Sequence, residues 1–301
     1  MFNCQHGNAG LYWNLQAILD GLTYSSVYLS CAAGAMVYIS SVFHRVAFNP
    51  WGFFIGILIT FAVYNLNRKT DEEEDAINHS ERFQFTKKYE KVLFYSAGLA
   101  YASAIVIAAY YGPAALLIAL FPLLSGIFYS LPLLPARFGF RRIKEIPLMK
   151  SILVALAWAL PPALLPVYIT GGTICLTTLI LIFFFFSLVF INTVLFDMRD
   201  VEGDARSGVR TIPVILGRTH TRYALSAINL LTFFGILILA IPEVPLAALL
   251  VLLAGIVYVQ LYILLYRFID LGHILCDLLI DGQFIGLGAM VYFIACMGLV
   301  P

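Results

Sequence analysis

The chain has 301 residues, of which 61% are hydrophobic and only 12% carry a charge. Soluble domains carry about 25% charged residues, so this composition excludes an ordinary water-soluble protein and predicts an integral membrane protein in contact with lipid. The net charge of +1 excludes the strongly basic surface expected of a nucleic-acid-binding protein. The five cysteines have neither metal-site nor disulfide spacing, and we interpret them as small apolar side chains. No feature of the sequence indicates an obligatory protein partner.

A helix that crosses a bilayer needs about 20 apolar residues. Nine segments approach this length, and they predict an all-α membrane protein with nine transmembrane helices. In chain order the segments are residues 22–43, 51–66, 92–111, 113–134, 149–169, 173–196, 223–241, 245–266 and 279–300. We interpret residues 1–301 as one transmembrane domain, with 1–21 as an interfacial N-terminal segment and 67–91, 135–148 and 197–222 as its main loops.

The charged residues are distributed unevenly between the connections. With nine helices, 17 of the 18 Lys and Arg residues fall on one side of the membrane, and only Arg45 falls on the other. Because Lys and Arg accumulate in cytoplasmic loops, the N-terminus and the three main loops are predicted to be cytoplasmic in a multi-pass protein of the cell membrane. Of the 17 acidic residues, only Glu243 falls on the external side. We therefore look for function in the cytoplasmic loops.

The first acidic motif begins where the second predicted helix ends. It contains Asn67, Asp71 and Asp75, which are spaced four residues apart. On a helix this spacing places the three side chains in one stripe of oxygen atoms. Glu72, Glu73 and Glu74 fall off this stripe and are expected to be solvated, as is Glu202 beside the second motif.

The second acidic motif begins where the sixth predicted helix ends. Its members Asp197, Asp200 and Asp204 are spaced three and four residues apart, again on one helical face. Carboxylates this close repel one another unless a cation lies near them. Carboxylate and amide oxygens, completed by substrate phosphates, are suitable ligands for Mg²⁺.

Two alternatives compete with a Mg²⁺ site. Each acidic run taken alone is typical of a solvated helix end, and the two together also suit the ion site of a cation-coupled transporter. A transporter does not account for the basic residues of the loop after the fourth helix, which are Arg137, Arg141, Arg142, Lys144 and Lys150. Cations of this kind stabilise a departing diphosphate, and we favour Arg142 and Lys144 for that role. Arg68, Lys69, Arg199 and Arg210, beside the two motifs, are further candidates.

Together the motifs resemble those of the UbiA-type intramembrane prenyltransferases. The first family signature is an Asn followed by Asp four and eight residues later, as in Asn67, Asp71 and Asp75; Arg68 replaces the acidic residue that usually follows the Asn. The second signature is matched by Asp197, Asp200, Gly203, Asp204, Gly208, Arg210, Thr211 and Pro213. Tyr129, Ser130 and Pro132, and the basic residues before the helix that contains Trp158, are similar to the middle loop of the family.

This resemblance implies nine helices around a central cavity, with both motifs at its cytoplasmic mouth. It implies Mg²⁺-dependent transfer of a prenyl group from a diphosphate such as geranyl, farnesyl or geranylgeranyl diphosphate, with release of diphosphate. The acceptor would be lipophilic, either an aromatic quinone precursor or the hydroxyl of a glycerol-phosphate lipid. The prenyl tail would extend into the membrane, because each buried CH₂ group contributes about 0.8 kcal/mol.

We expect Asn67, Asp71 and Asp75 to bind one Mg²⁺ ion, and Asp200 and Asp204 a second ion with support from Asp197. Asp71, Asp200 and Lys144 are the predicted catalytic residues. The predicted substrate-binding residues are Tyr64, Asn65, Arg68, Lys69, Tyr129, Arg142, Lys144, Asn192 and Arg210.

Several polar residues leave two interpretations open. Asn65 and Asn192 lie in apolar segments, where an amide either connects helices or contacts the substrate. Asp277 and Asp281 are spaced four residues apart at the start of the last helix and either cap the cavity or begin the helix. His79 lies in a loop and needs no function.

Overall fold

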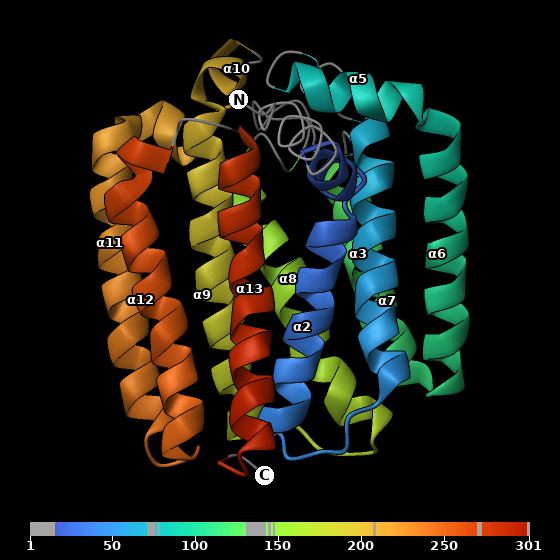
Figure 1. The fold of residues 1–301 in the computed structure, drawn as a ribbon, viewed down its shortest axis with the longest axis vertical. Coiled ribbons are helices and arrows are strands. Elements are labelled where there is room, and N and C mark those ends of the chain that lie inside the picture. The colour runs from blue at the N-terminus through green and yellow to red at the C-terminus, as the bar shows by residue number, and fades with distance from the viewer. Residues whose placement is uncertain are drawn as a thin grey trace, which may run out of the picture.

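The structure is a computed structural model that describes residues 16–70, 76, 79–130, 143, 146, 148–206, 209–269 and 273–299. These residues form helices and no β-strand, which confirms the predicted all-α membrane fold. The helices are α2 (Val27–Phe43), α3 (Pro50–Thr70), α5 (Ser80–Lys88), α6 (Glu90–Tyr110), α7 (Pro113–Ser130), α8 (Met149–Ile169), α9 (Leu176–Arg199), α10 (Val201–Arg206), α11 (Ile212–Ala240), α12 (Leu246–Ile269) and α13 (His273–Cys296). The long helices stand side by side in one bundle (Figure 1).

The long helices correspond to the predicted transmembrane segments. Within the described residues, seven helices are long and apolar enough to cross a membrane, and the pair Gln16–Tyr24 and Val27–Phe43 makes an eighth if its 66° bend is counted as part of one span. The remaining predicted segment coincides with the shorter apolar helix Pro113–Phe128. A total of nine transmembrane helices therefore stays a prediction.

Helix boundaries differ from the prediction where the sequence is polar. α3 continues to Thr70, α9 to Arg199, and α11 begins at Ile212, eleven residues before the predicted start. Thr211 is extended and Pro213 lies in the first turn of α11, which suits the start of a helix because proline needs no N–H partner there. Hydropathy did not reveal this part of α11. The predicted loops 67–91 and 197–222 therefore contain α5, α10 and the first part of α11.

The helices that carry the two motifs end at the same end of the bundle. α3 and α9 both terminate there, close to α5 and α10, while α13 terminates at the opposite end (Figure 1). α8 begins at the motif end and packs directly against α9. This arrangement brings Asn67, the described residue of the first motif, and the second motif, about 130 residues later in the sequence, to one end of the bundle.

α9 is the central helix of the larger core. Its side chains Phe184, Phe185 and Leu188 have at most 1% of their surface exposed, and α9 packs against α8 and α11. α2 and α3 approach closely through glycine, because a Cβ atom at Gly34 would lie 2.9 Å from Ile57 Cγ1. Small residues permit such close packing in membranes. The helix ends at the motif face are thus supported by a closely packed bundle.

Candidate functional site

A cavity of about 250 Å³ lies below the end of α3. Its polar residues include Asn67 and Arg68 at the end of α3 and Arg82 of α5, while α7 and α8 supply most of the apolar wall. Asn67 faces α7 at Gly126, where a Cβ atom would lie 3.7 Å from Asn67 Oδ1. The first residue of the first motif therefore opens into a cavity with positive charge at its rim.

A smaller apolar pocket of about 60 Å³ adjoins this cavity between α2, α3, α7 and α8. The two spaces share Val63, Tyr64, Pro122, Ala157 and Trp158 as lining residues. At their junction the indole Nε1 of Trp158 donates a hydrogen bond of 3.0 Å to the Tyr64 hydroxyl, and the two rings meet edge to face. The combined space is polar at one end and apolar at the other, as the binding site of an amphiphile requires.

Lys150 lies between two carboxylates of the second motif. Its Nζ is 2.7 Å from Asp197 Oδ1 and 4.0 Å from Asp204 Oδ2. Lys150 precedes the cavity-lining residues Leu153 and Val154 by one helical turn, so it lies on the same face of α8. Lys150 is therefore a described cation that lies beside Asp197 and Asp204 of the second motif.

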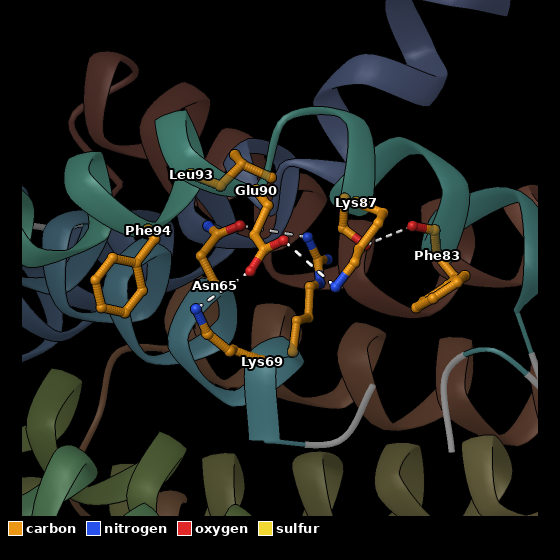
Figure 2. Close-up of a pocket in the computed structure, with 9 residues that line it drawn as sticks. Asn65, Lys69, Phe83, Lys87, Glu90, Leu93 and Phe94 are labelled. Carbon is orange, nitrogen blue, oxygen red and sulfur yellow. Dashed lines mark hydrogen bonds and ion pairs between the residues drawn. The ribbon is translucent and has the colours of Figure 1, made fainter. Parts of the chain in front are cut away.

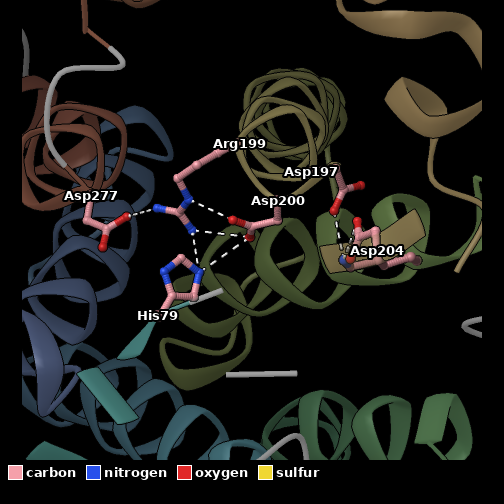
Figure 3. Close-up of polar contacts among 7 residues, drawn as sticks. His79, Asp197, Arg199, Asp200, Asp204 and Asp277 are labelled. Atoms are coloured by element: carbon pink, nitrogen blue, oxygen red, sulfur yellow. Dashed lines mark hydrogen bonds and ion pairs between the residues drawn. The ribbon is translucent and has the colours of Figure 1, made fainter. Parts of the chain in front are cut away.

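Asp200 has different partners from Asp197 and Asp204. Arg199 donates to both of its oxygens, from Nε at 3.0 Å and from Nη2 at 3.4 Å, and also donates from Nη1 to Asp277 at 2.6 Å. His79 Nε2 lies 3.4 Å from Asp200 Oδ2. Figure 3 shows this group on one side and Asp197 with Asp204 on the other. The predicted stripe is interrupted because α9 ends at Arg199 and α10 begins at Val201.

His79 connects the segment after the first motif to the second motif. It lies four residues after Asp75 and 121 residues before Asp200 in the sequence. Its side chain is 7% exposed and contacts Asp200 and Arg199. The interpretation that His79 needs no function is therefore incomplete. The sequence does link His79 to the first motif, because His79 follows Asn67, Asp71 and Asp75 at the same four-residue spacing.

The electrostatics of the second motif suit a cation. Burial raises the pKa of Asp204 to about 6, an effect that Lys150 opposes and that Asp197 and Asp200 reinforce. Burial would also raise the pKa of Asp200, but the hydrogen bond from His79 and the charge of Arg199 hold it below its ordinary value. Asp204 Oδ2 is buried and accepts no hydrogen bond within the part of the chain described.

The carboxylate oxygens of the second motif are suitable ligands for Mg²⁺, but they do not form a complete Mg²⁺ site by themselves. Mg²⁺ prefers carboxylate oxygens and keeps several waters or substrate phosphates, and Asp204 offers a buried oxygen that lacks a hydrogen-bond donor. No group of three or more acidic, His or Cys side chains is arranged to hold a metal among the described residues. Asp71 and Asp75 lie outside those residues, as do Arg142 and Lys144, while Tyr129 is described only as part of α7.

The remaining predicted substrate residues have varied surroundings. Asn65 is 6% exposed and donates to the carbonyls of Ser25 and Phe61, so it connects α3 to the bend before α2. Asn192 is buried in α9, and Arg210 is exposed. These positions neither place nor exclude a substrate contact.

Two predicted substrate-binding residues at the end of α3, Arg68 and Lys69, form polar contacts outside the cavity. Arg68 donates to the Tyr24 carbonyl and to Asn65 Oδ1. Lys69 Nζ is 3.2 Å from Glu90, and Figure 2 shows Glu90 between Lys69 and Lys87 in a groove formed by α3, α5 and α6. Lys69 is thus turned toward α6, while Arg68 also lines the cavity.

Comparisons with known proteins agree with this arrangement. A family model described as the UbiA prenyltransferase family matches residues 27–271. Among curated proteins, no sequence matches this chain.

Several solved structures have a similar fold. A UbiA homologue from Archaeoglobus fulgidus bound to DMAPP and Mg²⁺ is 17% identical, with a TM-score of 0.63 over 91% of this chain and 99% of that chain. An apo UbiA homologue from Aeropyrum pernix K1 is 14% identical, with a TM-score of 0.66 over 88% and 98%. A digeranylgeranylglyceryl phosphate synthase is 15% identical, with a TM-score of 0.56 over 95% of both chains. At these identities the likeness concerns the fold.

Proposed function

This chain belongs to the UbiA prenyltransferase family, and we propose that it transfers a prenyl group from an isoprenoid diphosphate to a lipophilic acceptor with the help of Mg²⁺. The acceptor is an aromatic quinone precursor or the hydroxyl of a glycerol-phosphate lipid. Family membership favours this activity over cation-coupled transport.

The observation that carries the proposal is the shape of the cavity. Arg68, Arg82 and Asn67 surround its polar end, and the apolar pocket beyond Tyr64 and Trp158 continues between the helices. A prenyl diphosphate has the same division, with a charged head and an insoluble tail. The DMAPP and GPP bound with Mg²⁺ in the Archaeoglobus fulgidus homologues support this donor class.

The acidic residues have the role of holding Mg²⁺. Asp200 and Asp204, with Asp197 in support, hold one ion, and Asn67 holds another with Asp71 and Asp75. When bound, Mg²⁺ supplies positive charge that stabilises the departing diphosphate. Lys150, one turn before the cavity wall on α8, joins the cavity-lining Arg68 and Arg82 as a described cation that could contact the diphosphate, and Lys144 and Arg142 are further candidates for the same contact.

The cavity residues act on the prenyl group. The C1–O bond to the diphosphate breaks, a bond from C1 to the acceptor forms, and the proton that the acceptor loses passes to the released diphosphate or to water. Positive charge that develops near C1 is stabilised by aromatic faces such as Tyr64 and Trp158. Their mutual hydrogen bond fixes the two rings, and the apolar walls exclude the water that would hydrolyse the intermediate.

The experiment is an assay of the purified full chain in detergent with labelled geranyl, farnesyl and geranylgeranyl diphosphates. A panel of aromatic, naphthoate and glycerol-phosphate lipid acceptors is supplied, and products are identified by mass spectrometry. We expect one prenylated product class and stoichiometric diphosphate release, supported by Mg²⁺ or Mn²⁺. Ca²⁺ should support less turnover, because it takes more ligands at longer distances.

Two outcomes would contradict the proposal. Full turnover in excess chelator would exclude the metal-dependent mechanism. Cation flux in proteoliposomes without diphosphate release would favour the transporter.

A further inference from the structure

Arg199 is a buried cation shared by two carboxylates, Asp200 between α9 and α10 and Asp277 of α13. Its side chain is 7% exposed and lies against the Phe196 ring, with Cζ 5.0 Å from the ring centroid. It donates to both oxygens of Asp200, which follows it in sequence, and to Asp277 of α13 at 2.6 Å (Figure 3). The contact with Asp277 is the shorter of these ion pairs.

We propose that Asp277 is a positioning residue that holds Arg199 when Asp200 turns to Mg²⁺. This inference rests on the proposed function, in which Asp200 is a metal ligand. Asp277 is thus part of the donor site through Arg199, although it belongs to α13 and to neither acidic motif.

Arg199 and a bound Mg²⁺ would compete for the carboxylate of Asp200. A guanidinium that donates to both oxygens of a carboxylate occupies the geometry in which that carboxylate binds a metal side-on. A buried guanidinium that loses its only carboxylate is left uncompensated, which is strongly unfavourable. Without a second partner, Arg199 would therefore retain Asp200 and oppose the metal. Asp277 removes this conflict, since Arg199 stays paired when Asp200 leaves it.

Other charged groups around Arg199 do not replace Asp277. His79 Nε2 lies 3.1 Å from Arg199 Nη2 and 3.4 Å from Asp200 Oδ2, and an imidazole carries no negative charge that could balance the guanidinium. Asp281 lies one turn further along α13 and interacts with Arg199 through its charge, without a hydrogen bond or ion pair among the described residues. Asp277 is the acidic side chain of α13 that reaches the guanidinium.

The test is a double-mutant cycle on metal binding rather than on turnover. Binding of Mn²⁺ to the full chain in detergent is followed by electron paramagnetic resonance, with geranyl diphosphate present. In Asp277→Asn, Asp200 is the only carboxylate left to pair with Arg199. Binding of Mn²⁺ should therefore weaken about 10-fold, as it does when a residue that orients a metal ligand is lost. Arg199→Gln in the Asp277→Asn background removes the competing cation and should restore binding to within about threefold of the wild type.

The Mn²⁺ affinity of the double variant distinguishes a positioning role of Asp277 from a merely structural role. A merely structural Asp277 predicts that the double variant binds Mn²⁺ as weakly as Asp277→Asn or more weakly, and this result would overturn the proposal. Unchanged binding in Asp277→Asn would overturn it as well. If Asp277→Asn does not fold, the double variant alone decides, because it removes both buried charges together: binding near the wild-type value supports the proposal, and a loss of about 10-fold or more rejects it.

A matched control separates this inference from the proposed function. Glu243→Gln makes the same kind of acid-to-amide change at a residue that contacts Thr177, at the other end of α9, and should leave Mn²⁺ binding unchanged. A wild-type protein that binds no Mn²⁺ with geranyl diphosphate contradicts the proposed function itself. Wild-type binding without the predicted cycle contradicts only the role of Asp277.

Discussion

Lys150 at the start of α8 and Asp197 near the end of α9 form an ion pair of 2.7 Å. The Asp197 side chain is only 4% exposed, whereas that of Lys150 is 32% exposed. The ammonium group therefore faces both the second motif and solvent at the mouth of the bundle. This pair shows that the second motif accommodates a cation beside its carboxylates.

We predict that Lys150→Met lowers kcat/KM for the prenyl diphosphate about 100-fold, as loss of a charge-stabilising donor does. Lys150→Arg keeps the charge and should recover part of the activity. Lys88→Met makes the same change at an exposed residue of α5 that contacts the Tyr89 ring, and should change kcat/KM little. Steady-state kinetics with varied prenyl diphosphate give the answer; equal losses in Lys150→Met and Lys88→Met would contradict a specific role for Lys150.

Substitution of the second-motif carboxylates should lower turnover far more than substitution of their exposed neighbour Glu202. Asp200→Asn and Asp204→Asn are each expected to lower turnover about 100-fold or more, because each removes a charged ligand of a catalytic metal. Glu202 is exposed on α10, and Glu202→Gln should stay within a few-fold of the wild type. Turnover and Mn²⁺ binding are measured together, and a Glu202→Gln defect as large as the others would show that total negative charge matters rather than ligand geometry.

The sequence predicted the transmembrane architecture well because the hydrophobic segments are long and contain few charges. It was less informative at the motif end. Ile212–Arg222 is helical although it is not continuously apolar, and Gly217 with φ of 76° interrupts it. Hydropathy reports only unbroken apolar length, and the apolar run of α11 begins after its first turns, so the predicted start is too late.

The partners of the acidic motifs were largely beyond sequence reasoning. Asp197, Asp200 and Asp204 were found from their spacing, but the spacing of residues in one helix says nothing about contacts with another helix. The pairs Lys150–Asp197 and Arg199–Asp277 join residues 47 and 78 positions apart. They depend on how α8 and α13 pack against α9 or its end.

The space beside Asn67 should be sensitive to volume. A Cβ atom at Gly126 would make an ordinary contact of 3.7 Å with Asn67 Oδ1, so Gly126→Ala should be tolerated. Gly126→Leu would fill the cavity beside Asn67 and is expected to abolish binding of labelled geranyl diphosphate while the protein still folds. The matched control is Gly286→Leu, since Gly286 has open space around it. Normal binding by Gly126→Leu would place the diphosphate away from Asn67.

Close packing of α2 on α3 predicts a stability difference between two glycines. A Cβ atom at Gly34 would lie 2.9 Å from both Ile57 Cγ1 and Phe53 Cε2, whereas one at Gly98 of α6 would meet nothing within 4 Å. Gly34→Leu should therefore destabilise the protein by about 1–3 kcal/mol through overpacking, and Gly98→Leu should not. Thermal unfolding in detergent compares them, and equal melting temperatures would contradict the close approach of α2 and α3.

Sidedness tests the predicted topology together with the shared site. α5 and α10 lie at the same end of the bundle (Figure 1), and the excess of Lys and Arg predicts that this end is cytoplasmic. Single cysteines replacing the exposed residues Gln84 of α5 and Glu202 of α10, in a background without the five native cysteines, should react with an impermeant maleimide only from the cytoplasmic side. A cysteine replacing Glu243 should react only from outside.

The same labelling experiment is repeated with substrate present. A prenyl diphosphate with Mg²⁺ should slow labelling at positions 84 and 202, because the ligand would bind between the segments that carry the two motifs, but should leave position 243 unchanged. Labelling of 84 and 202 from opposite faces would mean that the motifs cannot share one substrate, and the single-site mechanism would then fail. Labelling of both from the external face would retain the shared site and reverse the topology, which would require the prenyl diphosphate to be supplied from outside the cell.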